Sequence, residues 1–395
     1  MRQSRRGFVE SITGRGTMTR ADVADWLAAR GNEDYQARAG QAAVSVPPGV
    51  KAIKISGNEN PLGPGKAAID AIVRQFPEAA RYPFNGTPAD HTLAAALAKS
   101  FGAKPENVVL GAGSQEILKS AVRCFTSPGR GLVTASPSFE NPVTMAKKLG
   151  HPVVEVKLDT ALRLDLDAMA AAVKGAGLVF VNNPNNPTAT VHGASAIAAF
   201  VKRVRAESPD TVILIDEAYH DYVTDPAYRT AVPLALETPN VFVARTFSKA
   251  YGMAGLRIGY AIGAPATVAP LARLRMPYNV ATLSVAAAMA SLADPKHIAA
   301  ERERNTEVRA FTVKVFDELG CRATDSQANF IFVDIGRTAA SFRDACAQQG
   351  VLVGRDFPPL EKTHARVSIG TMDEMKKAAS VFRSILRPVA TTAGR

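Results

Sequence analysis

The sequence is poor in cysteine, and it contains no long apolar run. Its three cysteines, Cys124, Cys321 and Cys346, are scattered along 395 residues and form no Cys-x-x-Cys pair. This excludes a disulfide framework and a cysteine zinc site, and it favours a reducing compartment. No stretch approaches the roughly 20 apolar residues that a membrane-spanning helix requires. We therefore expect a soluble, cytoplasmic protein.

Positive charge is abundant but not concentrated. The 47 Lys and Arg residues exceed the 36 Asp and Glu residues and give a net charge of +11, yet no basic run is longer than two residues. A nucleic-acid interface needs a basic stripe or patch. The dispersed charge instead favours anionic small-molecule substrates, with neither nucleic acid nor membrane as a partner. The six histidines are also scattered, and we expect no metal site.

The first 50 residues are expected to form a charged N-terminal leader or arm. The segment Gln3-Ser-Arg-Arg-Gly-Phe-Val9 is similar to a twin-arginine export motif. An export signal also needs an apolar stretch of roughly 7–15 residues after the arginines. Charged residues such as Glu10, Arg15 and Arg20 interrupt every candidate stretch. Export by the twin-arginine route is therefore the less favoured alternative to a cytoplasmic location.

From about residue 105 onward, short apolar runs alternate with helical patterns. We expect strands near residues 108–110, 131–134, 153–156, 178–181, 212–215 and 241–243. Several of these runs are apolar without alternation, which indicates strands buried on both faces of a mostly parallel sheet. Helical patterns such as 194–206 supply the crossovers. Residues 51–290 are therefore predicted to form a large α/β domain with a doubly wound sheet.

Residues 291–395 are predicted to form a smaller C-terminal α/β domain. A charged helix is expected over 296–318, and strand and helix patterns alternate again over 327–390. Residues 51–60 are expected to pack with this smaller domain.

Two ionisable residues stand where buried strands end. Asp216 ends the run Val-Ile-Leu-Ile, and Lys249 follows the strand at 241–243. In doubly wound sheets, ligands bind beyond the carboxyl ends of the strands. A partly desolvated lysine has a lowered pKa and can form a Schiff base. Burial of a carboxylate there costs free energy unless it is paired with a cation or hydrogen-bonded. The carboxylate could cap a helix or hold a protonated pyridine nitrogen.

A third feature suits a phosphate group. Gly111-Ala-Gly-Ser114 joins a strand to a helix, and the first N–H groups of a helix bind anions. This turn alone is a weak signal. Thr246, Ser248 and Arg257 complete the cradle, because a guanidinium can grip phosphate with two parallel hydrogen bonds.

Three segments resemble the signatures of fold-type I, pyridoxal-phosphate-dependent class I/II aminotransferases. They are Asn183-Pro-Asn-Asn-Pro-Thr188, Asp216-Glu-Ala-Tyr219, and Thr246-Phe-Ser-Lys249 followed by Gly255-Leu-Arg257. Further segments narrow the resemblance to the histidinol-phosphate aminotransferase-like branch: Asn58-Glu-Asn-Pro-Leu-Gly-Pro64, Arg81-Tyr-Pro83 and Gly113-Ser-Gln-Glu116. The resemblance covers about residues 50–390.

The resemblance implies pyridoxal 5'-phosphate as cofactor and Lys249, Asp216 and Tyr219 as catalytic residues. Lys249 would form the Schiff base with the cofactor (the internal aldimine) and later move the α-proton. Asp216 would pair with the ring nitrogen, and Asn186 and Tyr219 would hydrogen-bond the phenolate oxygen. The remaining cofactor contacts would be Ser114, Gln115, Thr246, Ser248 and Arg257 at the phosphate and Phe139 on the ring.

The resemblance also assigns substrate and subunit contacts. Arg366 would clamp the substrate α-carboxylate and Arg355 would bind a substrate phosphate, while Tyr278 and Asn58 would also bind substrate. Tyr82 would reach the cofactor phosphate of a partner subunit, which implies a homodimer with shared active sites.

The implied reaction is transfer of an amino group from a small-molecule donor to a 2-oxo acid acceptor. The donor would be histidinol-phosphate-like or aromatic. The sequence departs from the family pattern at Ala189, where Gly is usual, at Gln115, where Asp is frequent, and between Phe357 and His364. These departures leave the substrate open. A decarboxylase, a lyase or cyclase, or an amino-acid oxidase on the same fold is the alternative, since Lys249, Asp216 and Arg366 suit all of them.

Overall fold

The computed structural model describes residues 46–83 and 89–386. The twin-arginine segment and the expected leader lie outside these residues, apart from residues 46–50. In the described part of the chain, no helix is both long enough and apolar enough to span a membrane.

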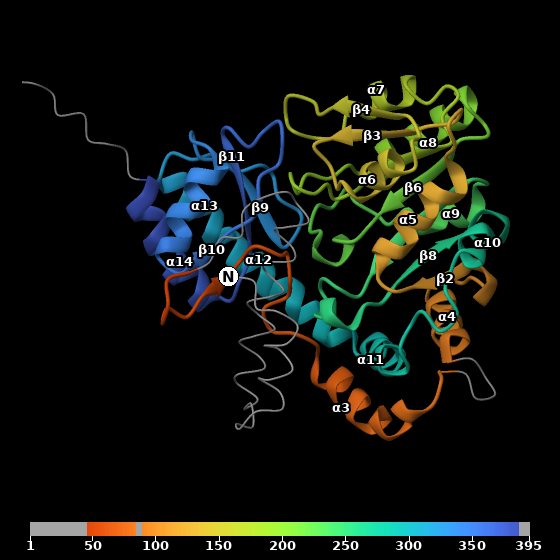
Figure 1. The fold of residues 1–395 in the computed structure, drawn as a ribbon, viewed down its shortest axis with the longest axis horizontal. Coiled ribbons are helices and arrows are strands. Elements are labelled where there is room, and N and C mark those ends of the chain that lie inside the picture. The colour runs from red at the N-terminus through yellow and green to blue at the C-terminus, as the bar shows by residue number, and fades with distance from the viewer. Residues whose placement is uncertain (1–45, 84–88, 387–395) are drawn as a thin grey trace, which may run out of the picture.

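A seven-stranded sheet forms the centre of the larger unit in the described residues (Figure 1). Its spatial order is β2-β8-β7-β6-β5-β3-β4. The bounds are Val108–Gly111 for β2, Leu132–Ser136 for β3, Val153–Lys157 for β4, Leu178–Asn182 for β5, Val212–Asp216 for β6, Val241–Thr246 for β7 and Gly259–Gly263 for β8. Strands β3 to β7 pair in parallel, whereas β8 is antiparallel to both of its neighbours. The predicted α/β class with a mostly parallel sheet is confirmed.

In the inner strands, successive residues enter hydrophobic clusters on opposite faces of the sheet. Val179 and Val181 of β5 belong to one cluster, and Leu178 and Phe180 belong to the other. On the first face pack α4 (Ala89–Ser100), α7 (Leu166–Ala171), α8 (Ala194–Glu207), α9 (Val232–Glu237) and α11 (Thr282–Leu292). On the second face pack α5 (Ser114–Phe125), α6 (Asn141–Lys148) and α10 (Pro265–Arg273). Because these strands are buried on both faces, their sequences are continuous runs of apolar residues.

Strand β8 was not expected from the sequence. It is short, begins and ends with glycine, and lies between β2 and β7. Its first residue, Gly259, packs so closely that a Cβ atom there would lie 2.4 Å from the backbone nitrogen of Ser114. Glycine is therefore required where the sheet passes beneath the start of α5.

A smaller unit surrounds a second hydrophobic cluster. It contains β9 (Phe330–Asp334) antiparallel to β11 (His364–Ser368), with α13 (Ala339–Gln348), α14 (Met372–Leu386) and part of the long α12 (Pro295–Glu318). Strand β1 (Ile53–Lys54) pairs in parallel with β10 (Val351–Leu352), and Ile55 enters the same cluster. The remaining elements are α3 (Lys66–Gln75) and four 3-10 turns: η1 (Phe76–Ala80), η2 (Pro105–Asn107), η3 (His220–Tyr222) and η4 (Ala254–Leu256).

Candidate active site

A cavity of about 260 Å³ lies beyond the carboxyl ends of β5, β6 and β7, and we call it the lysine cavity. The start of α5 and residues of the smaller unit complete its walls. Twelve of the residues singled out from the sequence line it: Asn58, Ser114, Gln115, Phe139, Asn186, Asp216, Tyr219, Thr246, Ser248, Lys249, Arg257 and Arg366.

Lys249 follows β7 and reaches into the lysine cavity. Its Nζ atom donates a hydrogen bond of 3.1 Å to the backbone oxygen of Asn58 and lies 5.5 Å from the ring centroid of Tyr219. Burial lowers the pKa of Lys249 to about 8, and the nearby Arg366 guanidinium acts in the same direction. A substantial fraction of this amine is therefore neutral near physiological pH, as a nucleophile or base requires.

Asp216 is the last residue of β6 and is almost completely buried. Its Oδ1 atom accepts a hydrogen bond of 3.1 Å from the backbone N–H of Ala218. Burial raises the pKa of Asp216 to about 7, while that hydrogen bond and the charge of Lys249 oppose the rise. In this buried position, a cationic partner would strongly favour the ionised form of the carboxyl group.

Another part of the lysine cavity has side chains and backbone groups that suit an anion. Helix α5 begins at Ser114, directly after Gly113, whose φ is 77°. A Cβ atom on Gly113 would lie 2.1 Å from Nη2 of Arg257. The hydroxyl of Thr246 donates to that of Ser248 at 2.8 Å, and Nη1 of Arg257 donates to Ser248 at 3.4 Å. Helix N–H groups, hydroxyls and a guanidinium thus converge on one place.

Arg366 comes from β11 of the smaller unit and is fully buried. Its Nη1 atom donates to Oδ1 of Asn186 at 2.7 Å, and its Nη2 atom donates to the backbone oxygen of Ser56 at 2.8 Å. Its Nε atom is buried and has no hydrogen-bond partner among the described residues. A buried guanidinium with an unused donor suits an anionic ligand, because an unmet buried donor costs free energy.

Tyr219 is held in place by a short chain of hydrogen bonds. The side-chain nitrogen of Asn58 donates to the Tyr219 hydroxyl oxygen at 3.1 Å, and the Ser368 hydroxyl donates to Oδ1 of Asn58 at 2.7 Å. Asn58 adopts a positive φ of 53° to make these contacts. The tyrosine oxygen is therefore held by residues from two distant parts of the sequence.

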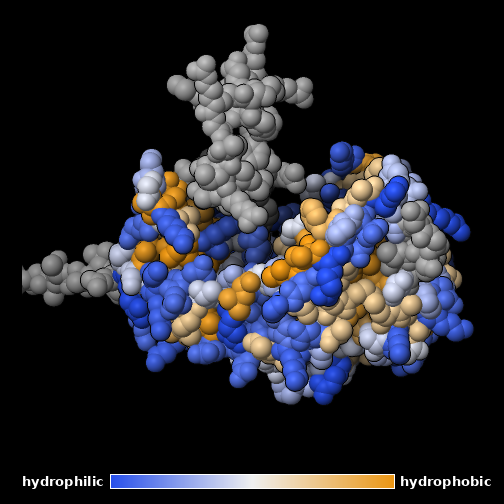
Figure 2. All heavy atoms as spheres, turned by 90° about the horizontal axis from the view of Figure 1, so that it is seen from below, coloured by the Kyte–Doolittle hydropathy of each residue, from blue (hydrophilic) through white to orange (hydrophobic). Residues whose placement is uncertain are grey.

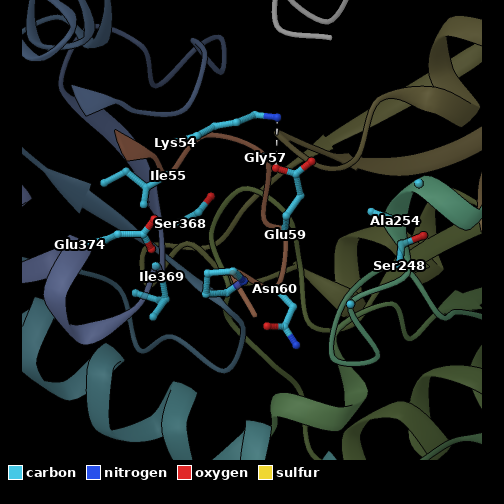
Figure 3. Close-up of a pocket in the computed structure, with 14 residues that line it drawn as sticks. Lys54, Ile55, Gly57, Glu59, Asn60, Ser248, Ala254, Ser368, Ile369 and Glu374 are labelled. Atoms are coloured by element: carbon cyan, nitrogen blue, oxygen red, sulfur yellow. Dashed lines mark ion pairs between the residues drawn. The ribbon is translucent and has the colours of Figure 1, made fainter. Parts of the chain in front are cut away.

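A second cavity of about 330 Å³, which we call the inter-unit cavity, adjoins the lysine cavity (Figure 3). Ser368, Ile369 and Glu374 line its side on the smaller unit. Ser248 and Ala254 face them from the larger unit. The ion pair of Lys54 with Glu59, at 3.3 Å, stands between the two sides.

A third cavity, of about 120 Å³, contains Arg355, and we call it the arginine cavity. It shares Phe139 with the lysine cavity. Arg355 is thus adjacent to the lysine cavity without lining it, and its guanidinium donates to the carboxylate of Glu140.

Tyr82 and Tyr278 do not line the lysine cavity in this chain. Their rings stack on each other with centroids 4.9 Å apart, and both side chains are largely exposed. They lie on the surface, so neither the expected cofactor contact of Tyr82 nor the expected substrate contact of Tyr278 is formed in the lysine cavity of the same chain.

Sequence reasoning assigned no role to Asn182 or Glu59, although both line the lysine cavity. Asn182 ends β5, as Asp216 ends β6, and its Oδ1 atom accepts a hydrogen bond of 2.8 Å from the backbone N–H of Asn186. Its position at a strand end already indicated that Asn182 lies at the ligand-binding edge of the sheet. Among the described residues, no group of three or more His, Cys, Asp and Glu side chains is placed to hold a metal ion.

Comparisons with known proteins agree with this geometry. A family model described as aminotransferase class I and II matches residues 50–382. A histidinol-phosphate aminotransferase of Moorella thermoacetica is 38% identical over 341 residues, which cover 86% of each chain. One from Brevibacillus brevis is 37% identical over 85% of this chain and 90% of its own. The crystal structure of histidinol-phosphate aminotransferase from Sinorhizobium meliloti in complex with pyridoxal-5'-phosphate has a TM-score of 0.78 and 28% identity, and the match covers 90% of this chain and 95% of that chain.

Proposed function

The chain belongs to the aminotransferase class I and II family, and we propose that it moves the amino group of an amino acid or amino alcohol phosphate to a 2-oxo acid. It is a pyridoxal-phosphate-dependent aminotransferase acting on small molecules. Relatives named for histidinol phosphate support a donor of that kind, and an aromatic amino acid is the other donor we propose. The observation that carries the proposal is one cavity with a buried amine, a buried carboxyl group and an anion cradle.

The residues present fit the cofactor. Its phosphate matches the cradle of Ser114, Thr246, Ser248 and Arg257, where the missing Cβ of Gly113 leaves room for the Arg257 guanidinium. Its basic ring nitrogen matches Asp216, the buried carboxyl group at the end of β6. We propose that the ring lies between these two places with Phe139 against its face.

When bound, pyridoxal phosphate supplies an aldehyde that amines attack and a ring that accepts electrons when a bond to the substrate α-carbon breaks. Asp216 would hold a proton at the ring nitrogen, because its carboxylate stabilises the protonated, cationic form of that nitrogen. Asn186 and Tyr219 hold the ring's phenolate oxygen. Lys249 is the residue whose amine would hold the aldehyde.

Lys249 is also the group that moves the α-proton. Burial keeps part of the amine population neutral, as its lowered pKa shows. A neutral amine can take the proton from the α-carbon and return it elsewhere as an ammonium group. Arg366 orients the donor by binding its anionic group, with the buried Nε atom as the donor still unused. In an amino-acid donor, holding the carboxylate in this way favours cleavage of the C–H bond over loss of the carboxylate.

We propose that the enzyme is a homodimer with shared active sites. Exposed apolar side chains gather around α3 and the segments beside it: Leu62, Ile69, Val73, Phe76 and Met276. Figure 2, which views the side on which α3 lies, shows hydrophobic side chains spread across this face. A patch of this kind marks a protein interface. Tyr82 follows on the same segment, from which it would reach the phosphate of the partner's cofactor.

We further propose two domains divided near residue 290, as the sequence suggests. The two separate hydrophobic clusters support this division, and the β1–β10 pairing supports the assignment of residues 53–55 to the smaller domain.

A single-turnover experiment tests the proposed reaction. The holoenzyme is mixed with histidinol phosphate or with one amino acid at a time, with no 2-oxo acid present. We expect conversion of the cofactor to its amine form, followed in the absorbance spectrum, and one equivalent of a carbonyl product. Release of carbon dioxide, ammonia or hydrogen peroxide instead would assign the enzyme to another reaction type of this fold.

A further inference from the structure

Ala189 occupies a backbone position that favours glycine. Its φ is 60°, in the left-handed region where a side chain costs free energy, and the family pattern usually has glycine there. The residue is fully buried. A residue in such a conformation persists only where the surrounding structure holds it. The neighbours of the Ala189 methyl group must therefore offset a conformational cost.

The methyl group of Ala189 belongs to a small hydrophobic cluster that joins the two units of the chain. The other buried members are Tyr219, Ala328 and Phe330. The rings of Tyr219 and Phe330 meet edge to face, with their centroids 5.0 Å apart. Tyr219 belongs to the larger unit, whereas Phe330 is the first residue of β9 in the smaller unit. Ala189 thus shares one cluster with an aromatic ring from each unit.

The backbone around Ala189 also joins the two units. The backbone oxygen of Ala189 accepts a hydrogen bond of 2.8 Å from the N–H of Gln327, and that of Thr188 accepts one of 2.5 Å from the hydroxyl of Thr324. Gln327 and Thr324 both precede β9. On the side of the larger unit, the N–H of Ala189 donates to the backbone oxygen of Asn185 at 2.7 Å. A change of conformation at residue 189 would therefore reach both units.

The two rings of the cluster contact the groups that we assign to the cofactor and the donor. Tyr219 lines the lysine cavity itself. The ring centroid of Phe330 is 5.5 Å from the Cζ atom of Arg366. Asn186, three residues before Ala189, accepts the hydrogen bond from Nη1 of Arg366. Ala189 does not line the lysine cavity, so it can affect a ligand only through these neighbours.

We propose that Ala189 is a positioning residue whose methyl group fixes Tyr219 and Arg366 relative to each other. Loss of a buried methyl group leaves a void, and a close-packed interior transmits the resulting shift to its neighbours. Glycine would also give the backbone of residues 186–189 more freedom. This inference rests on the proposed function, because it takes Tyr219 as a contact of the cofactor's phenolate oxygen and Arg366 as the site for the donor's anionic group.

The first test follows the bound cofactor in Ala189→Gly. A hydroxyl that donates to the phenolate oxygen stabilises the deprotonated form of the bound cofactor, so that its absorbance changes with pH at a lower midpoint. If Tyr219 is held less firmly, that midpoint should rise by about half a pH unit. Absorbance titration of the holoenzyme provides the midpoint. In a Tyr219→Phe background, Ala189→Gly should add no further shift, because the hydroxyl is already absent.

The second test measures the anion site at Arg366. 3-Phenylpropionate has a carboxylate but no amino group, so it binds without reacting. Its Kd for the holoenzyme, from isothermal titration calorimetry, should rise about fivefold in Ala189→Gly, because Phe330 and Asn186 hold the guanidinium less firmly. Asn240→Gly is the matched control, since Asn240 also has a φ of 60° and lies outside the lysine cavity. It should leave the Kd and the absorbance midpoint unchanged.

The outcomes separate this inference from the proposed function. An unchanged midpoint or an unchanged Kd in Ala189→Gly would overturn the role of Ala189 alone, whatever the change in Tm. A midpoint shift that persists in the Tyr219→Phe background would do the same. Failure of the wild-type holoenzyme to bind 3-phenylpropionate would overturn both the Arg366 anion site and this inference. Transamination remains testable by the single-turnover spectrum, which does not depend on Ala189.

Discussion

Lys249 and Asp216 are both withdrawn from water, and burial moves their pKa values toward each other. The pKa of Lys249 falls to about 8 and the pKa of Asp216 rises to about 7. In each case the largest cause is desolvation, which disfavours the charged form. Near neutral pH each group is therefore present in both its charged and its neutral form, and the charges that the cofactor brings would shift the balance.

A pH dependence follows for the cofactor-free enzyme. Only the neutral amine of Lys249 attacks an aldehyde, and its pKa lies at about 8 instead of 10.5. The rate of pyridoxal phosphate capture should therefore rise with pH to a midpoint near 8 and level off above it. Stopped-flow absorbance measures this rate, and Lys249→Ala should show no such phase. A midpoint near 10 would contradict the effect of burial on this amine.

Arg366 is expected to set the affinity for the donor. Arg366→Lys keeps the charge but removes the planar fork of donors. Binding of the donor should weaken by about 2 kcal/mol, roughly thirtyfold in KM, and Arg366→Ala should cost about 2–5 kcal/mol. Steady-state kinetics with the donor found in the single-turnover panel provides the measurement. An unaltered KM in the Lys variant, with an unaltered Tm, would remove Arg366 from donor binding.

At the scale of elements, the start of α5 and the turn before it set the geometry of the anion cradle. Gly113 has a φ of 77°, and its missing side chain leaves the space that the Arg257 guanidinium fills. Gly259 of β8 lies under the same turn, where a Cβ atom would meet the backbone of Ser114. The cradle thus requires glycine both in the turn before α5 and in the strand beneath it.

Gly113→Ala should therefore impair cofactor binding. The new methyl group would displace Arg257. In addition, residue 113 would keep a positive φ that side chains disfavour, and the change costs roughly 1–3 kcal/mol of folding stability. The Kd of pyridoxal phosphate, measured by equilibrium dialysis, should rise about tenfold or more as the Arg257 hydrogen bonds are lost. Gly255→Ala is the matched control, because a Cβ atom there meets nothing within 4 Å. Equal effects of the two substitutions would refute the cradle.

At the scale of the whole molecule, a single chain leaves the apolar face around α3 exposed to solvent. Val73 is 67% exposed and Phe76 is 63% exposed, next to the segment that contains Tyr82. A second copy of the chain would bury these side chains and bring Tyr82 to the partner's active site.

Val73→Asp should dissociate the proposed dimer, because a charge in an apolar interface loses its hydration. Sedimentation equilibrium should show a dimer for the wild type and a monomer for the variant. Val154→Asp provides the control, since Val154 is an exposed valine on β4, away from α3. A wild-type monomer would refute the dimer outright.

Tyr82→Phe tests whether the subunits share their sites. Loss of the hydroxyl should remove one hydrogen bond, which weakens the binding free energy by about 1 kcal/mol. The cofactor Kd should therefore rise severalfold. If Tyr82 contacts only Tyr278 of its own chain, cofactor retention should not change.

The sequence by itself determined the α/β class, most strands of the sheet and the residues at their carboxyl ends. Continuous apolar runs, glycine turns and polar strand ends are local patterns, and a parallel sheet brings its carboxyl ends to one edge. For this reason local patterns alone suffice to place Asp216, Lys249 and Ser114 in one site.

Only the tertiary structure decided which distant segments meet. Arg366 reaches Asn186 across 180 positions, and Arg355 meets Glu140 across 215. Strand β8 enters the sheet beside β2, which precedes it by about 150 residues. No local pattern encodes such contacts, because they depend on the order of the strands in the sheet and on how the smaller unit packs against it. The proposed reacting groups follow from local patterns, whereas the proposed substrate-binding residues are brought together by packing.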